Sequence, residues 1–259
     1  MDLHVERAGS GPAVLWIHGY TMDSTLWRPL WDLLPGFCHL GLDLPGHGRS
    51  GPLRPGETLP ALADRVAEIV RAERAERVVA LSFGSCLALQ LAAALPGLIA
   101  RLVVAAPTIA GARPADGVAS RDRQLAMLHR LAGPGPHLTR LWMTSPPDIF
   151  RGTEDHPDLR DRLRQVIDAH SWAELGNGAM RSLAGYVHTD AELGRISAQT
   201  LVLTGDQDMP AFWANAARLG AVLPSCTLLT VPGAGHLCLL ERPDDVAGAL
   251  TEHLAVRSA

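Results

Sequence analysis

Short apolar runs alternate with stretches at helical spacing through most of this 259-residue chain. Apolar runs bounded by glycine and proline are typical of buried strands, whereas apolar residues three or four positions apart indicate helices. The expected strands are 14–17, 37–42, 77–81, 102–105, 200–204 and 227–231, and the expected helices are 24–34, a segment from 58 onward, 83–95, 210–222 and 244–256. This order predicts an α/β fold with a mostly parallel, doubly wound sheet covered by helices on both faces.

The alternation is interrupted between residues 110 and 190. This stretch contains proline and glycine clusters at 133–136 and 145–147, and helical segments without a clear strand. It predicts a largely helical cap, 110–190, inserted before the last core strands, with 1–109 and 191–259 forming the core. A single domain is expected because α/β folds of this length often remain undivided.

Composition and charge restrict the kind of partner. Apolar residues make up 47% of the chain and the formal net charge is only -4, so the basic surplus of a nucleic-acid-binding protein is missing. The uncharged stretch 78–100 is long enough to resemble a membrane helix. Ser82, Gly84, Gln90 and Pro96 interrupt it, and a strand, a turn and a helix in the core explain it better. We therefore expect a small-molecule partner, no nucleic acid and no membrane.

Cysteine usage bears on the cellular compartment. Cys38, Cys86, Cys226 and Cys238 form no CxxC pair and lie in apolar stretches, as buried thiols of a reducing compartment do. The first seven residues have neither a basic start nor an apolar run, so no secretory signal is expected. These features predict a cytoplasmic protein.

Reactive side chains follow three of the expected strands. Ser82 comes directly after the strand at 77–81, and His236 ends a glycine-rich turn near the end of the chain. Asp206 and Asp208 follow a third strand. A serine hydroxyl is a weak nucleophile, so an imidazole must take its proton and a carboxylate must hold the imidazole in the correct tautomer. The chain offers each of these groups, which predicts nucleophilic catalysis by Ser82.

At these motifs the chain resembles the α/β-hydrolase superfamily. The order serine, aspartate, histidine is that of the superfamily, and its G-x-S-x-G motif appears here as residues 80–84, with alanine at the first position. Two further motifs strengthen the resemblance, His18-Gly19 after the first core strand and the segment 43–50 after the next. The similarity runs from about Val14 to Val256 apart from the cap.

The resemblance implies a role for each candidate residue. Ser82 would be the nucleophile and His236 the general base, and the spacing of the family favours Asp208 over Asp206 as the orienting acid. An oxyanion hole would come from the backbone N–H groups of Phe83 and Tyr20. A serine at the nucleophile position separates the chain from relatives such as haloalkane dehalogenases and epoxide hydrolases, which carry an aspartate there, and favours acyl chemistry.

No cofactor or metal is expected. Residues 46–51 match the dinucleotide fingerprint G-x-G-x-x-G, but prolines follow them in place of the helix that would receive a pyrophosphate. The histidines show no metal-ligand spacing. We therefore expect His18 and His47 to serve hydrogen bonds within loops.

The leading hypothesis is a serine hydrolase that cleaves a carboxylic ester, lactone or thioester of a small molecule through an acyl-enzyme on Ser82. The substrate is expected to have an apolar acyl or ring portion, with Trp142 and Trp172 of the cap as candidate contacts. Two alternatives stay open. The same triad serves lyases, C–C hydrolases, cyclising enzymes and acyl transferases of this fold, and a ligand-binding receptor is less favoured because all three triad residues are present.

Overall fold

A seven-stranded sheet forms the centre of the computed structural model, which describes residues 3–146, 148–177, 183 and 185–255. The spatial order of the strands is β1-β3-β2-β4-β5-β6-β7, and all neighbours are parallel except β1 and β3. The strands are β1 Val5–Gly9, β2 Ala13–Ile17, β3 Cys38–Leu42, β4 Arg77–Leu81, β5 Arg101–Ala105, β6 Gln199–Gly205 and β7 Cys226–Val231. The predicted α/β fold with a mostly parallel sheet is confirmed.

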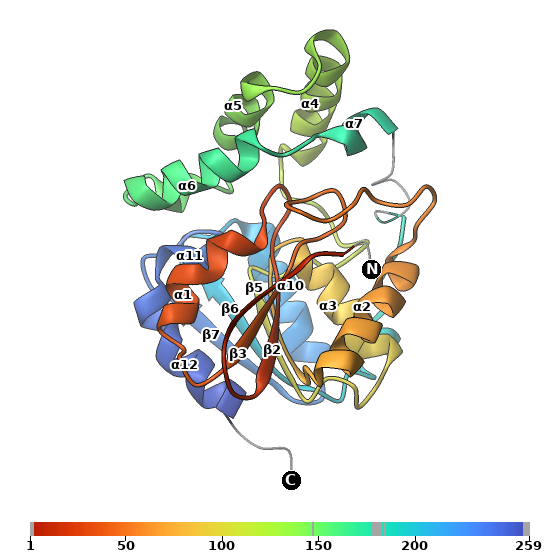
Figure 1. Cartoon of the computed structure of the whole chain (residues 1–259), viewed down its shortest axis with the longest axis vertical. Helices are drawn as coiled ribbons and strands as arrows, with labels where there is room; N and C mark the ends of the chain where they lie inside the picture. Colours follow the sequence, from red (N-terminus) through yellow and green to blue (C-terminus); the bar gives the residue numbers. More distant parts are fainter. Residues whose placement is uncertain (1–2, 147, 178–182, 184, 256–259) are drawn as a thin grey trace.

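Helices cover both faces of this sheet, as Figure 1 shows. On one face α1, α11 and α12 pack together, and on the other α2, α3, α9 and α10 lie side by side. The core helices are α1 Arg28–Asp32, α2 Leu59–Glu73, α3 Gly84–Ala94, α9 Asp190–Leu193, α10 Pro210–Val222, α11 Cys238–Glu241 and α12 Pro243–Ala255. Two apolar clusters, one on each side of the sheet, form the core.

The expected elements and the observed ones agree closely, except near the N-terminus and at the short helices α9 and α11, which were not predicted. Thr58 caps α2 by accepting a hydrogen bond from the Ala61 N–H at 3.4 Å. The expected helix at 24–34 is a 3-10 turn, Ser24–Trp27, followed by the short helix α1. Strand β1 was not predicted, because its residues, Val5 to Gly9, carry charges and show no apolar run.

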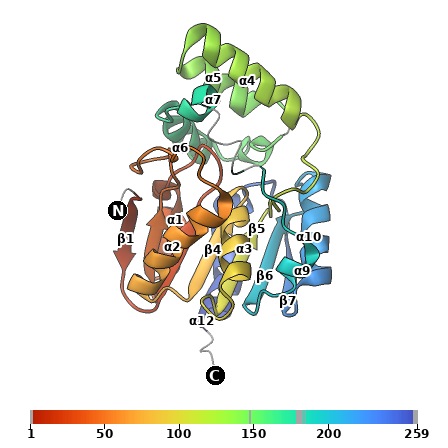
Figure 2. The ribbon, with the colours of Figure 1, turned by 90° about the vertical axis from the view of Figure 1, so that its right-hand side faces the viewer.

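The segment expected to form the cap lies above the carboxyl ends of the strands (Figure 2). Its helices, coloured green in Figures 1 and 2, form a layer of their own over the core. They are α4 Val118–Ala132, α5 Pro136–Thr144, the 3-10 turn Arg151–Thr153, α6 Pro157–Asp168 and α7 Ala173–Asn177. The boundaries 110 and 190 stay a prediction.

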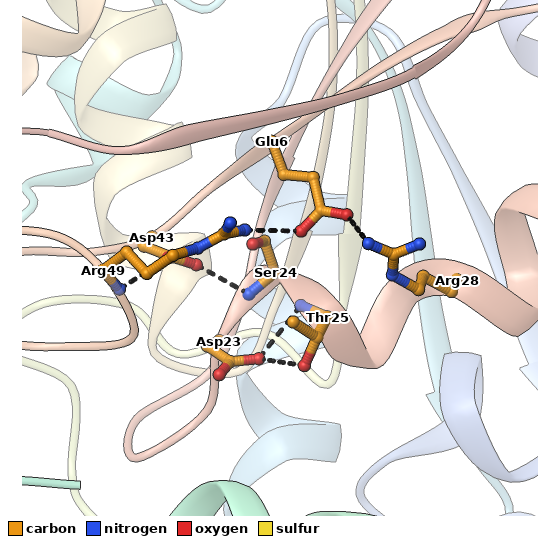
Figure 3. A network of polar contacts seen from close by, with 7 residues as sticks. All are labelled: Glu6, Asp23, Ser24, Thr25, Arg28, Asp43 and Arg49. Carbon is orange, nitrogen blue, oxygen red and sulfur yellow. Dashed lines mark hydrogen bonds and ion pairs between the residues drawn. The ribbon is translucent and has the colours of Figure 1, made fainter. Parts of the chain in front are cut away.

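A polar network ties strand β1 to helix α1 and to the loop after β3 (Figure 3). Glu6 forms ion pairs with Arg28 and, at 2.7 Å, with Arg49. The buried Asp43 carboxylate accepts hydrogen bonds from the backbone N–H groups of Ser24 at 2.8 Å and Arg49 at 2.9 Å. Asp43 therefore holds the 3-10 turn Ser24–Trp27, which follows the loop that carries Tyr20, against the loop after β3.

The uncharged stretch 78–100 forms strand β4, the turn after it and helix α3, as expected. Across the described ranges, no helix has both the length and the apolar character needed to cross a membrane.

Candidate active site

Ser82 occupies a strained turn between β4 and α3. Its φ is +53°, a left-handed conformation that is uncommon for a residue with a side chain. The turn is held because the Ser82 N–H donates to the Ala105 carbonyl at 2.9 Å. Gly84 lets the helix approach the sheet, since a Cβ at this position would lie 2.6 Å from the Ile17 and His18 carbonyl oxygens. The Ser82 side chain is thereby raised above the sheet edge.

His236 and Asp208 complete a hydrogen-bonded chain with Ser82. The Ser82 Oγ lies 2.7 Å from Nε2 of His236, and Nδ1 of His236 lies 3.1 and 3.2 Å from the two carboxylate oxygens of Asp208. A carboxylate only accepts, so Nδ1–H donates to Asp208 and leaves Nε2 free to accept from the serine hydroxyl. Both side chains are buried, with His236 only 1% exposed. The structure therefore brings together the three side chains that the sequence singled out.

Asp206, the rival acid, lies in a different position. Its Oδ1 accepts a hydrogen bond from the Gly233 N–H at 2.9 Å, and the side chain is exposed. Asp206 therefore stabilises the turn after β7, whereas Asp208 contacts the imidazole.

The loop after β2 places Tyr20 beside Ser82. His18 fixes this loop: its Nε2 accepts from the Leu44 N–H at 3.0 Å, so its Nδ1–H donates to the Gly19 carbonyl at 2.7 Å. In the part of the chain that the structure describes, neither the Tyr20 N–H nor the Phe83 N–H donates to a backbone carbonyl.

A cavity of about 590 Å³ opens beside Ser82 and Tyr20, between the core and the upper helices. Its wall is largely apolar, and includes Phe83, Ile109, Leu125, Trp142, Ile149, Leu175 and Phe212. Trp142 is one of the two tryptophans expected to contact a substrate. Trp172, the other, does not line this cavity; it is 1% exposed and packs near the rings of Tyr20 and His170.

The model of the alpha/beta hydrolase family matches residues 14–249, which is nearly the whole chain. The chain belongs to the alpha/beta hydrolase family. The resemblance noted from the motifs is thereby confirmed.

Relatives of this hydrolase include several ester hydrolases. It is 31% identical over 270 residues to the lipase LipV of Mycobacterium tuberculosis, with 99% of each chain covered. It is 29% identical over 258 residues to a pimeloyl-[acyl-carrier protein] methyl ester esterase of Xanthomonas oryzae, covering 98% of this chain and 99% of that one. A thermophilic esterase from Thermogutta terrifontis superposes with a TM-score of 0.80 at 26% identity, covering 98% of this chain and 93% of the other. These relatives confirm the prediction that the chain is an enzyme of the carboxylic ester hydrolase class.

The loop that carries His236 is held by a buried carboxylate that the sequence analysis did not single out. Glu241 of α11 accepts hydrogen bonds from the backbone N–H groups on either side of the histidine, Gly235 at 2.5 Å and Leu237 at 2.9 Å. Gly152 of the upper layer packs against the same carboxylate, since a Cβ there would lie 2.2 Å from Glu241 Oε2. Only the fold reveals this contact, because Glu241 alone carries no motif.

We expect Glu241→Gln to destabilise the hydrolase and slow its chemistry. One carboxylate oxygen becomes an NH2 group that faces a backbone N–H, which costs about 1–3 kcal/mol of unfolding free energy. Urea unfolding and kcat measure the two effects. The exposed Glu252→Gln on α12 is the matched control and should change neither. A Glu241→Gln variant with parental stability and kcat would show that the carboxylate does not hold the loop.

A buried polar cluster joins the Tyr20 loop to the upper helix α7. The Tyr20 hydroxyl donates to Glu174, and His170 Nε2 lies 3.0 Å from the same carboxylate oxygen. Burial alone would raise the pKa of Glu174, but hydrogen bonds from His170 and Tyr20 outweigh it and lower the pKa to about 2. Burial and the Glu174 charge raise the pKa of the Tyr20 hydroxyl well above its usual value. The cluster therefore fixes Tyr20 as a neutral donor to an ionised Glu174.

His47 lies against this cluster as a neutral ring. Its Nδ1–H donates to the Pro45 carbonyl at 2.9 Å, as expected for a loop histidine, and its ring centre lies 4.6 Å from that of His170. Its Nε2 is buried and has no partner among the described residues. Burial, and then the nearby rings of His170 and His18, lower the pKa of His47 to about 3, although the Glu174 charge acts in the opposite direction.

The lowered pKa of His47 predicts a loss of stability in mild acid. The unfolded chain takes up this proton near pH 6.5, whereas the folded chain resists it until about pH 3. The stabilisation is present above the unfolded pKa and is lost as the pH falls, by about 1 kcal/mol between pH 7 and 5.5 for this residue alone. His47→Asn keeps a donor for Pro45 and should reduce that loss in urea unfolding. An equal loss in the variant would contradict the assignment.

Within the described ranges, no group of three or more His, Cys, Asp and Glu side chains is arranged to hold a metal ion. The segment 46–51 is a loop, and the next helix begins only at Leu59. It therefore lacks the geometry of a dinucleotide site.

Proposed function

We propose that this hydrolase cleaves a carboxylic ester, lactone or thioester of a small molecule through an acyl-enzyme on Ser82. The observation that carries the proposal is the continuous hydrogen-bonded chain from Ser82 through His236 to Asp208, with a serine–imidazole distance of 2.7 Å. Such a chain activates a hydroxyl that is otherwise a weak nucleophile.

The proposed reaction has two halves. His236 Nε2 takes the proton of Ser82 as Oγ attacks the carbonyl carbon, and returns it to the leaving alcohol or thiol as the ester bond breaks. A water molecule then loses its proton to His236 and attacks the acyl carbon, which releases the acid and restores Ser82. Asp208 stabilises the imidazolium in both halves without itself taking the proton.

The backbone N–H groups of Tyr20 and Phe83 are the proposed oxyanion hole. Phe83 directly follows Ser82. Tyr20 follows Gly19, which lies so near the nucleophile that a Cβ placed on it would be 3.4 Å from the Ser82 Cβ. Donors fixed in this way stabilise the negative charge that develops on the substrate oxygen. The contact of Tyr20 with Glu174 supports the role, because it restrains the residue that carries one of the donors.

The apolar wall of the cavity favours a substrate with an apolar acyl or ring portion. Apolar side chains dominate its wall, and Trp142 from α5 contributes a large aromatic surface that is otherwise buried. Segment 110–190 would act as a roof over Ser82. We assign Trp172 a supporting role behind Tyr20 in place of the expected substrate contact.

The cysteines bear on the location of the hydrolase in the cell. All four are free thiols, three of them buried. A cytoplasmic location fits these thiols, and localisation of a tagged chain in cells would test it.

A panel of esters, lactones and acyl thioesters tests the proposed function. The proposal predicts hydrolysis of at least one class, with one oxygen atom from labelled water in the acid product. Release of product without solvent oxygen would favour a lyase, cyclase or acyl transferase that uses the same triad. Binding without any turnover of the panel would favour a ligand receptor.

A further inference from the structure

A buried arginine lines the cavity beside Ser82. Arg121 lies in the first turns of α4, and only 5% of its side chain is exposed. A guanidinium keeps its charge in proteins, so its burial is costly unless acceptors surround it. The position of Arg121 therefore requires an explanation.

Arg121 is incompletely satisfied by the chain itself. Its Nε and Nη2 both point to one oxygen of its neighbour Asp122, at 3.4 and 3.2 Å, and that carboxylate side chain is 56% exposed. Its Nη1 is buried and has no acceptor among the described residues. One strong donor is therefore left over next to the cavity.

The contacts of Arg121 connect it to the reacting end of the cavity. Its guanidinium carbon lies 3.9 Å above the ring of Trp142, whose ring centre is 5.2 Å from that of Tyr20. Arg121, Trp142, Tyr20 and Ser82 all line the same cavity. A substrate with its carbonyl at Ser82 can thus extend along Trp142 towards Arg121.

The start of α4 adds to the positive potential. Its N-cap residue, Gly117, has no side chain to cap the helix, and no acidic residue lies in the first turn. Val118, the first helical residue, lines the cavity as well. The positive end of the helix dipole favours an anion, in the same sense as the guanidinium.

Two other charged groups of the cavity, Glu174 and Arg113, are less suited than Arg121 to bind an anion. Glu174 is already engaged by Tyr20 and His170, and it disfavours an anion near that end. Arg113 is 89% exposed, so solvent screens its charge. Arg121 is the buried cation of the described cavity wall.

We propose that Arg121 binds a carboxylate on the acyl portion of the substrate, so that the preferred substrates are monoesters or monothioesters of dicarboxylic acids. The inference rests on the proposed ester hydrolysis and names its substrate class. Arg121 Nη1 donates a charge-assisted hydrogen bond to the distal carboxylate while the ester carbonyl lies at Ser82.

Paired substrates that differ only in charge test this assignment. Monomethyl adipate carries a free carboxylate and dimethyl adipate does not, and the corresponding succinate and suberate esters vary the chain length. At neutral pH the parent enzyme should prefer the charged ester in kcat/KM. Arg121→Gln should lower the ratio of charged to neutral ester by about tenfold or more, mainly through KM, because one charge-assisted hydrogen bond is lost. Arg121→Lys should restore part of the ratio.

Arg123→Gln is the matched control, since it removes the same charge from an exposed position on the same helix. It should leave the ratio unchanged. An Arg121→Gln variant that keeps the parental ratio of charged to neutral ester, even if its activity on both esters falls, would overturn the proposal and leave Arg121 a packing role.

Binding of free adipate separates this inference from the proposed function. Adipate should raise the melting temperature of the parent enzyme and have a much smaller effect on Arg121→Gln. If no ester is cleaved but adipate binds in this manner, the carboxylate site stands and ester hydrolysis fails. If esters are cleaved but adipate stabilises both proteins equally or neither, the carboxylate site fails.

Discussion

Replacement of Ser82 by alanine is expected to abolish ester turnover, with a loss in kcat on the order of a millionfold. The variant lacks only the hydroxyl group, whose oxygen in the parent lies 2.7 Å from Nε2 of His236, the base that would activate it. Without it His236 has no nucleophile to deprotonate, and no acyl-enzyme can form. Labelling by a fluorophosphonate should disappear together with turnover.

Ser85→Ala is the matched control for this variant. Ser85 is a fully buried serine in the first turn of α3, and its Oγ has no hydrogen-bond partner in the described part of the chain. The control should remain active and labelled, with both variants folded by thermal melting. Turnover by folded Ser82→Ala at the parental rate would remove the basis of the mechanism.

Replacement of Asp208 by asparagine is expected to lower kcat by about 10⁴-fold. In the parent enzyme the Asp208 carboxylate accepts a hydrogen bond from Nδ1–H of His236 at 3.1 Å, which leaves Nε2 free to accept the serine proton. An asparagine presents its NH2 group to the ring and favours the opposite tautomer, in which Nε2 carries a hydrogen and cannot act as a base. Binding should change much less, so KM is expected to stay near the parental value.

Asp206→Asn provides the comparison at the neighbouring carboxylate. It keeps an oxygen that can accept from the Gly233 N–H, so kcat should fall by less than about tenfold. Steady-state kinetics of the two variants on one ester measures the ranking. The opposite ranking would assign the orienting role to Asp206.

The parts of this structure that follow local patterns could be predicted from the sequence. The run 77–81 forms β4 with the expected ends, and Pro210–Val222 forms α10 as expected, because apolar spacing and proline positions determine both. Parallel strands bring their carboxyl ends to one edge, and Leu81, Ala105 and Leu203 are in register there. Side chains that follow separate strands, such as Ser82 and Asp208, are therefore placed close together.

The remaining features depend on contacts between distant segments. Glu241 holds the His236 loop, and Glu174 contacts Tyr20 across 154 positions in the sequence. No spacing rule pairs such residues. Strand β1 was missed for a related reason, since its charged residues pair with β3 and with Arg28 and Arg49 only in the folded chain. The sequence does not distinguish Trp172 from Trp142. Only the packing of the folded chain shows that Trp142 lines the cavity and that Trp172 does not.

The acyl-enzyme itself provides the most direct test of the account. The parent enzyme would be mixed with an activated ester, quenched in acid within milliseconds to seconds, and measured by intact-protein and peptide mass spectrometry. The account predicts a transient mass increase equal to the acyl group, on the peptide that contains Ser82, rising and decaying at rates consistent with kcat. Steady hydrolysis with no acyl adduct at any time, or an adduct on a residue other than Ser82, would contradict it.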